Sequence, residues 1–477
     1  VRNPDAFASR YPGVGNVAGR FDGKLSNDAE RLTLHGPMQE PILDFKYSDA
    51  WHLTTDGAGF SLVLTDENSP PAEWQLAASW RPSAALLGSP GRSDTSPPVF
   101  VPVVINEALT HTDPPILDAI ELWNPTTVPA DVGGWFLTDD PDRPDKYRIP
   151  DRVVIQPGDY AVFDEAQFNA DGTGFALNSR GDAVYLFSAN GTRLTGYAHG
   201  FSFGAAARDA TFGRHVDSLG REHFVAQAVP SLGQPNIGPS VGPVIISEIM
   251  FEPFSGSSYN DTLHEFVELR NVTDRPIPLF DPLHPEHPWL IQGGIEFAFP
   301  AGCMMQARSH LLLVNFDPEA DPVSLAVFRS DYAVPDGVQV VGPYKGNLAN
   351  EGERIELCRP DPPQTVPDPF VGFVPYILVE GIKYSPVTPW PTNAAGTGFS
   401  LQRISAGAFG NDPANWEAGP PTPGALNLSS MTADLDSDDL PDEWELLHGL
   451  RSDNSSGDNG PLGDPDGDSF NNIAEYT

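Results

Sequence analysis

Cysteine is scarce in this chain, whose 477 residues include only Cys303 and Cys358. Two thiols can form at most one disulfide, which is too few to cross-link a chain of this length, so a disulfide scaffold is excluded. The two thiols can be separate and buried, or they can form one disulfide that ties two strands together. Both alternatives stay open, because a disulfide requires a particular separation of the two Cα atoms that a sequence does not give.

Positive charge is also scarce. Lysine and arginine number 27 against 65 aspartate and glutamate residues, which gives a formal net charge of −38. A field of this sign repels nucleic-acid phosphates and anionic lipid head groups, so we expect neither as a partner. It suits a protein that works in a salty or calcium-containing medium.

Long apolar runs and targeting signals are missing. No run reaches the roughly 18 residues that a membrane-spanning helix needs, and neither a signal peptide nor an initiator methionine opens the chain. We therefore expect the sequence to be a fragment of a longer protein. The missing signals do not argue against secretion in that case.

Helical periodicity is rare, whereas turn-forming residues are common. The chain holds 45 glycines and 50 prolines, and only 19% of its residues are charged. This composition favours short strands separated by many turns. A hydrophobic content of 40% argues against wholesale disorder, and the length predicts roughly three domains.

A repeated pair of apolar strands organises the chain. Residues 103–124 and 244–271 both read apolar, apolar, Ile, Asn or Ser, Glu, and then a polar loop. After the loop, both copies read acid, any residue, Ile or Val, and Glu-Leu-x-Asn. The copies lie about 140 residues apart, which indicates a repeated domain.

The second half of the repeat occurs a third time, near the start of the chain. Residues 25–31 match residues 348–354 and, more weakly, residues 177–183, and an alternating strand follows each of them. A Gly-rich turn and strand at residues 56–62 has its counterpart at residues 395–401. Similar tails close the three units, at residues 80–91, 229–235 and 416–424.

These matches predict an all-β chain of tandem immunoglobulin-like β-sandwiches, with six to eight short strands in each complete unit. We expect residues 1–95 to be the C-terminal part of one sandwich, residues 100–238 to be a complete sandwich, and residues 243–428 to be a sandwich with insertions. Short proline-containing linkers at residues 96–99 and 238–243 should act as stiff spacers.

At these residues the chain resembles the lamin-tail domain family. The family signature is Ile-Asn/Ser-Glu, then Glu-Leu-x-Asn, then Gly-Trp-x-Leu-x-Asp. All three elements occur in the second unit, at residues 105–107, 121–124 and 134–139. The third unit has the first two, at residues 246–248 and 268–271, but its third element departs, since residues 288–291 lack the Gly and the trailing Asp.

The resemblance covers about 90% of the chain as three units and implies an immunoglobulin-like fold, although a fold does not by itself imply a function. Animal nuclear lamins add a long coiled coil and a lipidated tail, and this sequence shows neither heptads nor such a tail. The pattern is more similar to large secreted or cell-surface proteins of bacteria that string these domains together.

The strongest chemical signal lies in residues 431–477, where two acidic loops repeat one spacing. Calcium takes six to eight oxygen ligands at about 2.3–2.6 Å, and EF-hand loops supply them from positions 1, 3, 5, 7, 9 and 12. In the first loop these positions hold Asp434, Asp436, Asp438, Leu440 with its main-chain carbonyl, Asp442 and Glu445. In the second loop they hold Asp464, Asp466, Asp468, Phe470 with its main-chain carbonyl, Asn472 and Glu475. The residue types and their spacing predict two Ca²⁺ sites.

The residues around these ligands fit the same interpretation. The turn position that favours Gly is Asp439 in the first loop and Ser469 in the second, and both residues are tolerable in left-handed backbone, Asp more readily. We expect a short amphipathic helix at residues 441–450 and the start of a second helix around Phe470, Ile473 and Tyr476. The apolar face of the first helix should carry Trp444, Leu447 and Leu450.

Residues 431–477 resemble the calcium-binding repeats of bacterial thrombospondin type 3-like and dockerin-like modules, which implies a small, truncated EF-hand-like module. Ten Asp, three Glu and one Arg give this segment a net charge of −12. Because these charges repel one another without cations, metal binding and folding should be coupled. The alternative interpretation is a solvated acidic tail.

Two weaker metal candidates remain. The acidic turn at residues 138–145 could hold a cation, although Asp-Pro pairs also begin hydrated turns. His284 and His287 have metal-capable atoms, but the prolines beside them prevent presentation from a helix, and zinc sites usually need a third protein ligand.

Four glutamates recur at matching strand positions: Glu107, Glu121, Glu248 and Glu268. A paired-carboxylate hydrolase needs two such acids facing across a cleft. Recurrence in both complete units favours acids that hydrogen-bond the sandwich instead. The sequence also has no Gly-x-Ser-x-Gly elbow, phosphate-binding loop or Cys-x-x-Cys pair, so we predict no catalytic residue.

Two hypotheses about function follow. The first is a non-enzymatic secreted or cell-surface protein, in which the sandwiches form a structural or adhesive array and the calcium loops stiffen or dock its end. Its partners would be calcium and an extracellular or cell-surface protein or polysaccharide. The second makes the sandwiches an accessory binding region of a larger secreted enzyme, whose hydrolase or spore-coat-kinase-like domain lies outside this fragment.

Overall fold

The computed structural model describes residues 1–95, 99–170, 172–254, 261–366, 369–427, 429 and 433–476. The predicted linker at residues 96–98, part of the loop inside the repeat at residues 255–260, and residues 431, 432 and 477 of the predicted terminal module lie outside the described residues. The chain divides into unit 1, which is Val1–Arg214 with Val229–Ile237, and unit 2, which is His215–Ala228 with Gly238–Thr477. Among the described residues, no helix combines the length and apolar character that a bilayer crossing requires.

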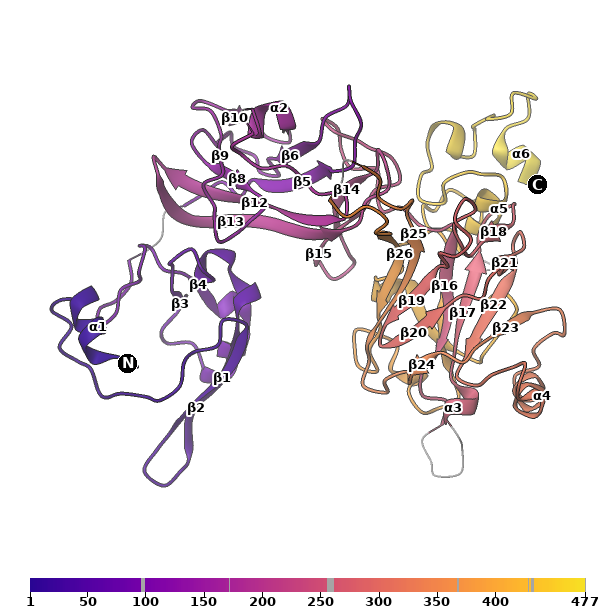
Figure 1. Cartoon of the computed structure of the whole chain (residues 1–477), viewed down its shortest axis with the longest axis horizontal. Coiled ribbons are helices and arrows are strands. Elements are labelled where there is room, and N and C mark those ends of the chain that lie inside the picture. The colour runs from indigo at the N-terminus through magenta and orange to yellow at the C-terminus, as the bar shows by residue number, and fades with distance from the viewer. Residues whose placement is uncertain are drawn as a thin grey trace. The chain divides into compact units, whose positions relative to one another are not determined.

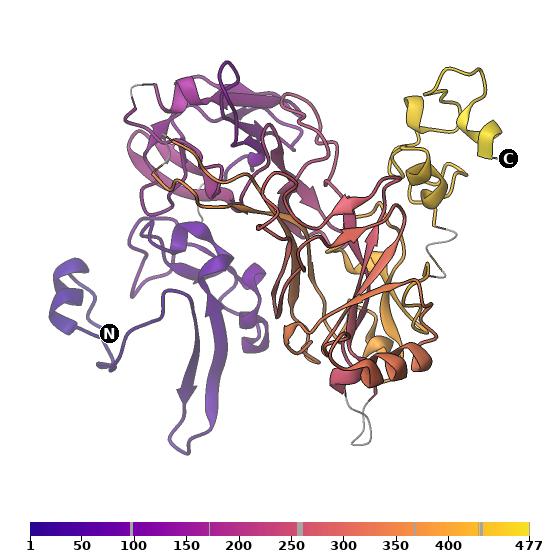
Figure 2. The ribbon, with the colours of Figure 1, turned by 45° about the vertical axis from the view of Figure 1, so that its right-hand side comes forward.

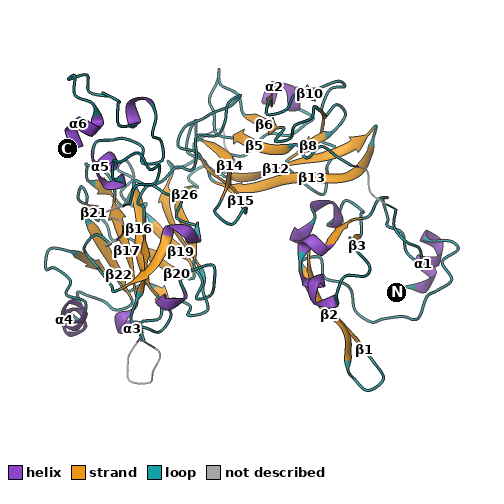
Figure 3. Cartoon of the chain, turned by 180° about the vertical axis from the view of Figure 1, so that it is seen from behind, coloured by secondary structure: helices purple, strands orange, loops and turns teal. Residues whose placement is uncertain are grey.

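The first segment of unit 1 is made of short elements with little buried core (Figure 3). Its elements are α1 (Pro4–Arg10), β1 (Ala29–His35), β2 (Pro41–Ser48), η1 (Asp49–Trp51), η2 (Leu53–Thr55), β3 (Leu62–Leu64), η3 (Pro71–Gln75), η4 (Ala77–Ser79) and β4 (Trp80–Pro82). Strand β1 pairs with β2, and β3 pairs with β4. Of the apolar side chains in residues 1–95, only Phe60 is buried, while Phe45, Trp74 and Trp80 contact one another in a half-buried aromatic cluster.

The rest of unit 1 is a two-sheet β-sandwich (Figure 1). Its elements are β5 (Val104–Leu109), β6 (Ala119–Trp123), β7 (Ala130–Asp131), β8 (Phe136–Thr138), β9 (Tyr147–Arg148), β10 (Val154–Ile155), β11 (Tyr160–Asp164), α2 (Glu165–Phe168), β12 (Gly181–Asn190), β13 (Arg193–Gly204) and β14 (Thr211–Val216). One sheet has the order β11-β6-β5-β14, and the other has the order β13-β12-β8-β9. Ile105 and Leu122 from the first sheet and Leu137 and Leu186 from the second are fully buried, so the core lies between the sheets.

Unit 2 contains a larger sandwich. The sandwich follows β15 (Glu222–Ala226), which is not one of its strands. Its elements are β16 (Val244–Met250), α3 (Asp261–His264), β17 (Phe266–Asn271), β18 (Ile277–Pro278), β19 (Leu290–Gly293), β20 (Ile295–Ala298), β21 (Met304–Met305), β22 (His310–Val314), α4 (Pro322–Asp331), β23 (Gln339–Val341), β24 (Lys345–Gly346), β25 (Arg354–Pro360), β26 (Tyr376–Lys383), η5 (Thr392–Ala394), β27 (Ser400–Arg403), η6 (Pro413–Asn415) and β28 (Trp416–Gly419). The sheets have the orders β23-β22-β17-β16-β27-β28 and β24-β20-β19-β25-β26. One apolar cluster joins their inner faces, with Ile246 and Leu269 from the first sheet and Ile291 and Leu357 from the second.

A helix adds a second, smaller core to this sandwich. Asp321 caps α4 by accepting a hydrogen bond from the backbone N–H of Ser324, and Pro322 occupies the first turn, where its missing N–H costs nothing. Phe328 of α4 packs against Phe266 in a cluster that also contains Met250, Leu312, Val314 and Val334. Figure 2 shows α4 beside α3 at one end of the sandwich.

Both cysteines are free and buried. Cys358 lies in β25, and the Sγ of Cys303 accepts a hydrogen bond from Nε2 of Gln339 at 3.3 Å. Of the two alternatives left open by the sequence, the structure has the separate thiols.

The terminal segment of unit 2 contains α5 (Asp442–Leu447), η8 (Gly457–Asn459) and α6 (Asn472–Tyr476). The prediction of an apolar-faced helix over residues 441–450 is wrong in two respects. The helix ends at Leu447, because Gly449 with φ of +75° takes the chain out of it. Its buried residues are Asp442 and Glu445, whereas Leu447 is 54% exposed.

Candidate metal centre

The first acidic loop brings five carboxylates together. Asp434, Asp436 and Asp438 each offer an oxygen atom that lies within 4.8 Å of the others. Helix α5 begins at Asp442 directly after the loop, so Asp442 and Glu445 lie on one face of it, three residues apart. The side chains of Asp442 and Glu445 are both fully buried.

Six oxygen atoms of this loop are buried without a hydrogen-bond partner. They are both carboxylate oxygens of Asp436, Oδ2 of Asp438, Oδ2 of Asp442, and both carboxylate oxygens of Glu445. Burial of an unpaired carboxylate is among the most costly arrangements in a protein, unless a proton or a cation neutralises the charge. The cluster therefore has the chemistry of a cation site.

Electrostatics point the same way. Burial and the neighbouring charges of Asp436, Asp438 and Asp442 raise the pKa of Glu445 to about 9. Burial and the other aspartates raise the pKa of Asp436 to about 6. A bound divalent cation would reverse both shifts, because it replaces repulsion between like charges with attraction.

A network of backbone hydrogen bonds shapes the first loop. The carboxylate of Asp434 accepts from the N–H groups of Asp438 and Asp439, at 3.2 and 3.1 Å. Asp438 Oδ1 accepts from the N–H of Leu440 at 3.0 Å. Asp439 has a φ of +75°, at the position where the spacing predicts left-handed backbone.

The second loop has the same backbone design. Asp464 Oδ2 accepts from the N–H of Ser469 at 3.1 Å, and Asp468 Oδ1 accepts from the N–H of Phe470 at 2.8 Å. Ser469 has a φ of +81°. The N–H of Asn472 donates to the carbonyl of Gly463, as the N–H of Asp442 donates to that of Ala433. Three backbone hydrogen bonds thus recur at equal loop positions.

The two loops differ in how completely they enclose a cation. Asp464, Asp466 and Asp468 approach one another within 4.8 Å but are exposed. Glu475, at the position of Glu445, is exposed as well. The side-chain amide of Asn472 donates to the backbone carbonyls of residues 458 and 460, at 2.9 and 2.8 Å. The first loop is therefore the better-formed site, and the carbonyl contributions of Leu440 and Phe470 stay predictions.

Helix α5 is anchored to the sandwich of unit 2. The guanidinium of Arg270 in β17 donates two hydrogen bonds of 2.5 Å to the carboxylate of Glu443. Arg308 donates to the carbonyl of Leu446 at 2.5 Å, and the Leu446 side chain packs against an apolar cluster that includes Ile245. Sequence reasoning missed these contacts, since the residues that they join are 173 and 138 positions apart in the chain.

The recurring glutamates form two buried pairs. Glu107 on β5 lies opposite Glu121 on β6, and Glu248 on β16 lies opposite Glu268 on β17. All four side chains are fully buried. Their carboxylates accept hydrogen bonds from the tail of their own sandwich.

In unit 1, the tail at residues 231–236 binds the first pair. Ser231 donates its N–H and its hydroxyl to the carboxylate of Glu107, at 2.9 and 2.8 Å. Gly233 donates its N–H to Glu121. Asn236 donates to the backbone carbonyls of Asn106 and Arg214, at 3.1 and 2.9 Å.

In unit 2, the tail at residues 422–427 binds the second pair in the same way. Thr422 donates its N–H to Glu248 at 3.0 Å, and Gly424 donates its N–H to Glu268 at 2.5 Å. Asn427 donates to the backbone carbonyls of Ser247 and Arg403, at 2.9 and 3.0 Å. We call each arrangement a tail clamp. The repeated spacing of the tails was visible in the sequence, but the glutamates that the tails bind were not predicted as their partners.

The weaker metal candidates have other partners. In the turn at residues 138–145, Asp139 forms an ion pair of 2.5 Å with Lys146. His284 and His287 lie beside a single acid, Glu286, at 3.5 and 3.7 Å. Within the part of the chain that the structure describes, only the two acidic loops assemble three metal-capable groups.

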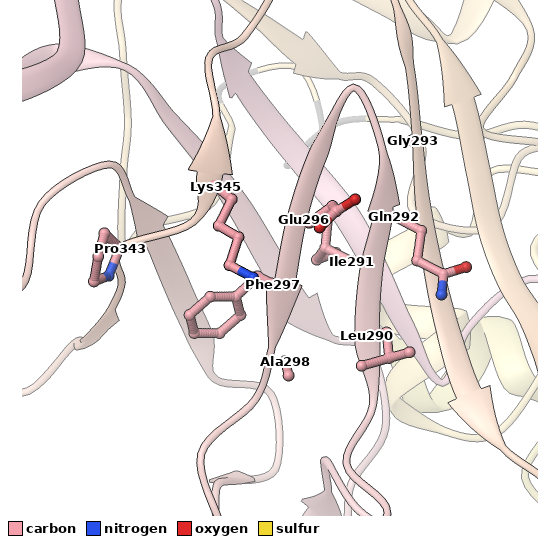
Figure 4. Close-up of a pocket in the computed structure, with 9 residues that line it drawn as sticks. All are labelled: Leu290, Ile291, Gln292, Gly293, Glu296, Phe297, Ala298, Pro343 and Lys345. Carbon is pink, nitrogen blue, oxygen red and sulfur yellow. The ribbon is translucent and has the colours of Figure 1, made fainter.

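Unit 2 also has a groove of about 540 Å³ beside the β19–β20 hairpin. Figure 4 shows Glu296 and Lys345, from paired positions on β20 and β24, among the residues that line it. Its lining holds one acid and no second carboxylate. This is not the pair of acids that glycoside hydrolysis requires.

A comparison with protein families identifies part of this architecture. The model of the Lamin Tail Domain matches residues 97–200, which include β5 and most of the unit 1 sandwich. The abundance of strands and the scarcity of helices agree with an all-β, immunoglobulin-like fold. A lamin tail domain, a non-enzymatic type of domain, is therefore present in unit 1. No curated protein and no solved structure matches the chain.

Proposed function

We propose that this chain is a non-enzymatic extracellular or cell-surface protein, in which lamin-tail-like sandwiches form a structural or adhesive array and the loop at residues 434–445 binds Ca²⁺. The observation that carries the calcium proposal is the set of buried, unpartnered carboxylate oxygens centred on Glu445. Hard oxygen ligands in this number suit Ca²⁺ better than Mg²⁺, which keeps more of its water.

Each residue of the loop has a role in the proposed site. Asp434 orders the turn through its backbone hydrogen bonds, and Asp436 and Asp438 supply oxygens from one side. Helix α5 supplies Asp442 and Glu445 from the other side. Because Glu443 of the same helix is held by Arg270, a cation bound here would tie the terminal segment to the sandwich of unit 2.

The proposal of an extracellular setting rests on the net charge of the chain and on the calcium affinity that is typical of extracellular modules. A net charge of −38 is compatible with a calcium-rich medium, and calcium modules outside cells commonly bind in the range of about 10⁻⁴ to 10⁻³ M. The opposed glutamates are occupied by tail clamps, which supports a structural role for the sandwiches rather than a catalytic one.

Calorimetric titration of the chain with CaCl₂ tests the proposal. We expect a stronger site, which Asp436→Asn/Glu445→Gln removes, and a weaker site, which the matched Asp466→Asn/Glu475→Gln variant removes. Circular dichroism of both variants would show that the sandwiches are intact. Absence of saturable heat at millimolar Ca²⁺, or an undiminished stronger site in the first variant, would contradict the proposal.

A further inference from the structure

Three tails of the chain share one six-residue pattern. Each begins with Ser or Thr, has Gly two positions later, and has Asn or Asp five positions after the first residue. The three sets are Ser89, Gly91 and Asp94; Ser231, Gly233 and Asn236; and Thr422, Gly424 and Asn427. The second and third tails form the tail clamps of the two complete sandwiches.

The first tail folds like the other two. The central glycine has a φ of +76° at Gly91, +82° at Gly233 and +88° at Gly424, a region that glycine enters without steric cost. Each tail also closes the same turn, because the residue after the glycine donates its N–H to the carbonyl of the first residue. These hydrogen bonds measure 3.2, 2.8 and 2.9 Å in chain order.

The first tail differs in what it binds. In the complete sandwiches, the N–H of the first residue and the N–H of the glycine donate to two opposed glutamates. Across the described residues, the N–H groups of Ser89 and Gly91 have no hydrogen-bond acceptor. The donors of a tail clamp are therefore present at Ser89 and Gly91 without its carboxylates.

Strand β3, near the first tail, has one edge that pairs with no other described strand. Strand β3 follows Gly59-Phe60-Ser61, as β27 follows Gly398-Phe399 and starts at Ser400. Strand β27 pairs with β28 on one side and with the glutamate strand β16 on the other. In the described ranges of the chain, β3 pairs with β4 alone, in a two-stranded sheet.

A groove lies along this edge. It has a volume of about 410 Å³ and is lined by residues 61–64 of β3 and its approach and by residues 87–90 of the tail. Phe7 of α1, Tyr11 directly after it, Glu67 and Trp80 complete the lining. The Tyr11 hydroxyl donates to the carbonyl of Leu87 at 2.7 Å. In a complete sandwich, the strand with the first glutamate of the pair lies between the corresponding strand and tail.

Burial of a matching tryptophan supports the comparison. Trp416 opens β28 and is 3% exposed in the core of the unit 2 sandwich. Trp80 opens β4, the corresponding strand, but is only half-buried. An added strand pair would cover the aromatic cluster around Trp80, which releases free energy in proportion to the apolar area removed from water.

We propose that this groove accepts a β-hairpin of the type that β5–β6 and β16–β17 form, by strand addition to β3. The first incoming strand would carry Ile-Asn/Ser-Glu, and its glutamate would accept the N–H of Ser89. The second strand would carry Glu-Leu-x-Asn, and its glutamate would accept the N–H of Gly91. Backbone pairing with β3 provides affinity, and the two carboxylates provide specificity.

One residue of the first tail departs from the pattern. Asp94 stands where the other tails have asparagine, and it accepts hydrogen bonds of 2.9 Å from Arg81 and from the N–H of Ala84. A carboxylate cannot donate to the carbonyl of an incoming strand, as Asn236 and Asn427 do. Asp94 also accepts from the hydroxyl of Ser89 at 2.7 Å, whereas the hydroxyl of Ser231 donates to Glu107. The acceptor groove therefore makes two contacts fewer than a complete tail clamp.

The probe is a synthetic peptide of residues 102–125, which contains β5 and β6, added to the full chain. Its matched control carries Glu107→Lys and Glu121→Lys. Hydrogen exchange read by mass spectrometry should slow at least tenfold at residues 61–64 and 87–92 with the first peptide and remain unchanged with the control. No slowing there at saturating peptide, or equal slowing by the control, would overturn the proposal.

A pair of chain variants sharpens the test. When β3 is aligned with β27, Val63 corresponds to Gln402. Gln402 lies opposite Glu248 in the unit 2 sandwich. Val63→Gln should retain peptide affinity, whereas Val63→Asp places a like charge opposite the incoming glutamate and should weaken binding at least tenfold. The assignment would be contradicted if both variants bound the peptide with equal affinity. It would also be contradicted if the slowing of exchange were confined to β14 or β27.

Discussion

Glu107 and Glu121 lie directly opposite one another on β5 and β6, and neither carboxylate is exposed to solvent. Like charges placed opposite one another destabilise a sheet. Here Glu107 accepts a hydrogen bond from Ser231 and Glu121 accepts one from Gly233, both in the tail of the unit 1 sandwich. Glu121 also accepts one from Asn106. The acids are tolerated because the tail and polar side chains of the strands together supply their hydrogen-bond donors. The same relationship recurs between Glu248 and Glu268.

The first prediction concerns pH. Burial and the charge of Glu107 together raise the pKa of Glu121 to about 7, although the hydrogen bonds from Gly233 and Asn106 lower it. Between about pH 4.5 and pH 7, the folded state holds a proton that the unfolded state has lost, so stability falls as the pH rises. The slope is at most about 1.4 kcal/mol per pH unit. Glu121→Gln should flatten it.

Hydrogen-exchange protection factors of β5 and β6, measured at pH 5 and pH 7.5, check this expectation. Tyr160 on the neighbouring strand keeps its proton in this range, since burial and the charge of Glu121 raise its pKa. Equal slopes for the wild-type chain and the variant would contradict the assignment.

The second prediction concerns the tail clamp of unit 2. Gly424 has a φ of +88°, and a Cβ there would lie 2.6 Å from Cγ2 of Val338. Gly424→Ala should therefore cost more than the roughly 1–2 kcal/mol of left-handed backbone alone. Gly302, with a φ of +76° and open space around a Cβ, is the matched control. In urea unfolding, Gly424→Ala should lose more free energy of unfolding than Gly302→Ala. Equal losses in the two variants would argue against a packed tail.

The third prediction concerns the sign of a charge effect. Glu445 is a buried acid among four others and has a pKa of about 9, so at pH 7 the calcium-free chain must take up a proton there when it folds. Glu445→Gln removes this cost and should stabilise the calcium-free chain by about 1–3 kcal/mol. With saturating Ca²⁺ the same change should destabilise the chain, since it removes a ligand. Thermal unfolding in EDTA and in CaCl₂ measures both. A variant less stable in both conditions would contradict a cation site.

The fourth prediction concerns the anchor of α5. Arg270 is 5% exposed and binds Glu443 through two parallel hydrogen bonds. A double-mutant cycle of Arg270→Ala and Glu443→Ala should give a coupling energy of about 1–3 kcal/mol. Arg270→Ala should also lower calcium affinity, because α5 carries Asp442 and Glu445. Arg275→Ala, which removes an exposed arginine, is the control, and equal calcium affinities in the two arginine variants would exclude the anchoring role.

The fifth prediction concerns the thiols. Burial raises the pKa of Cys358 to about 12 and also raises the pKa of Cys303. Neither thiol should react with Ellman's reagent in the native chain, and both should react in guanidinium chloride without a reductant. Failure to react in denaturant would reveal a disulfide instead.

Much of the fold follows from residue pattern. The apolar segment at residues 244–249 lies within β16, and the alternating segment at residues 355–358 lies within β25. Both are rich in apolar residues and bounded by turns, which is the usual signature of a buried strand. The all-β class and the two sandwiches could be predicted for this reason. The half-buried state of Trp80 could not, because it depends on which strands pair beside it.

The candidate site could be predicted only in part. The spacing of acids at residues 434–445 indicated the loop, since local geometry decides which positions point inward. The buried face of α5 was missed, because hydrophobic periodicity assumes that apolar side chains turn inward. Asp442 and Glu445 turn inward instead. The anchor at Arg270 was missed because it joins segments far apart in sequence.

The tail clamp has a mechanical consequence. The chain enters the unit 2 sandwich along β16 and leaves it through the turn at Thr422, and Glu248 and Asn427 join that exit to the entry strand. Tension between the two ends of the sandwich would therefore load these few hydrogen bonds before it reached the hydrogen bonds within the sheets. Under pulling, the α5 anchor at Glu443 should release first, and then Asn427 and Thr422 in turn. Each release yields a short length of slack while the sandwich stays folded.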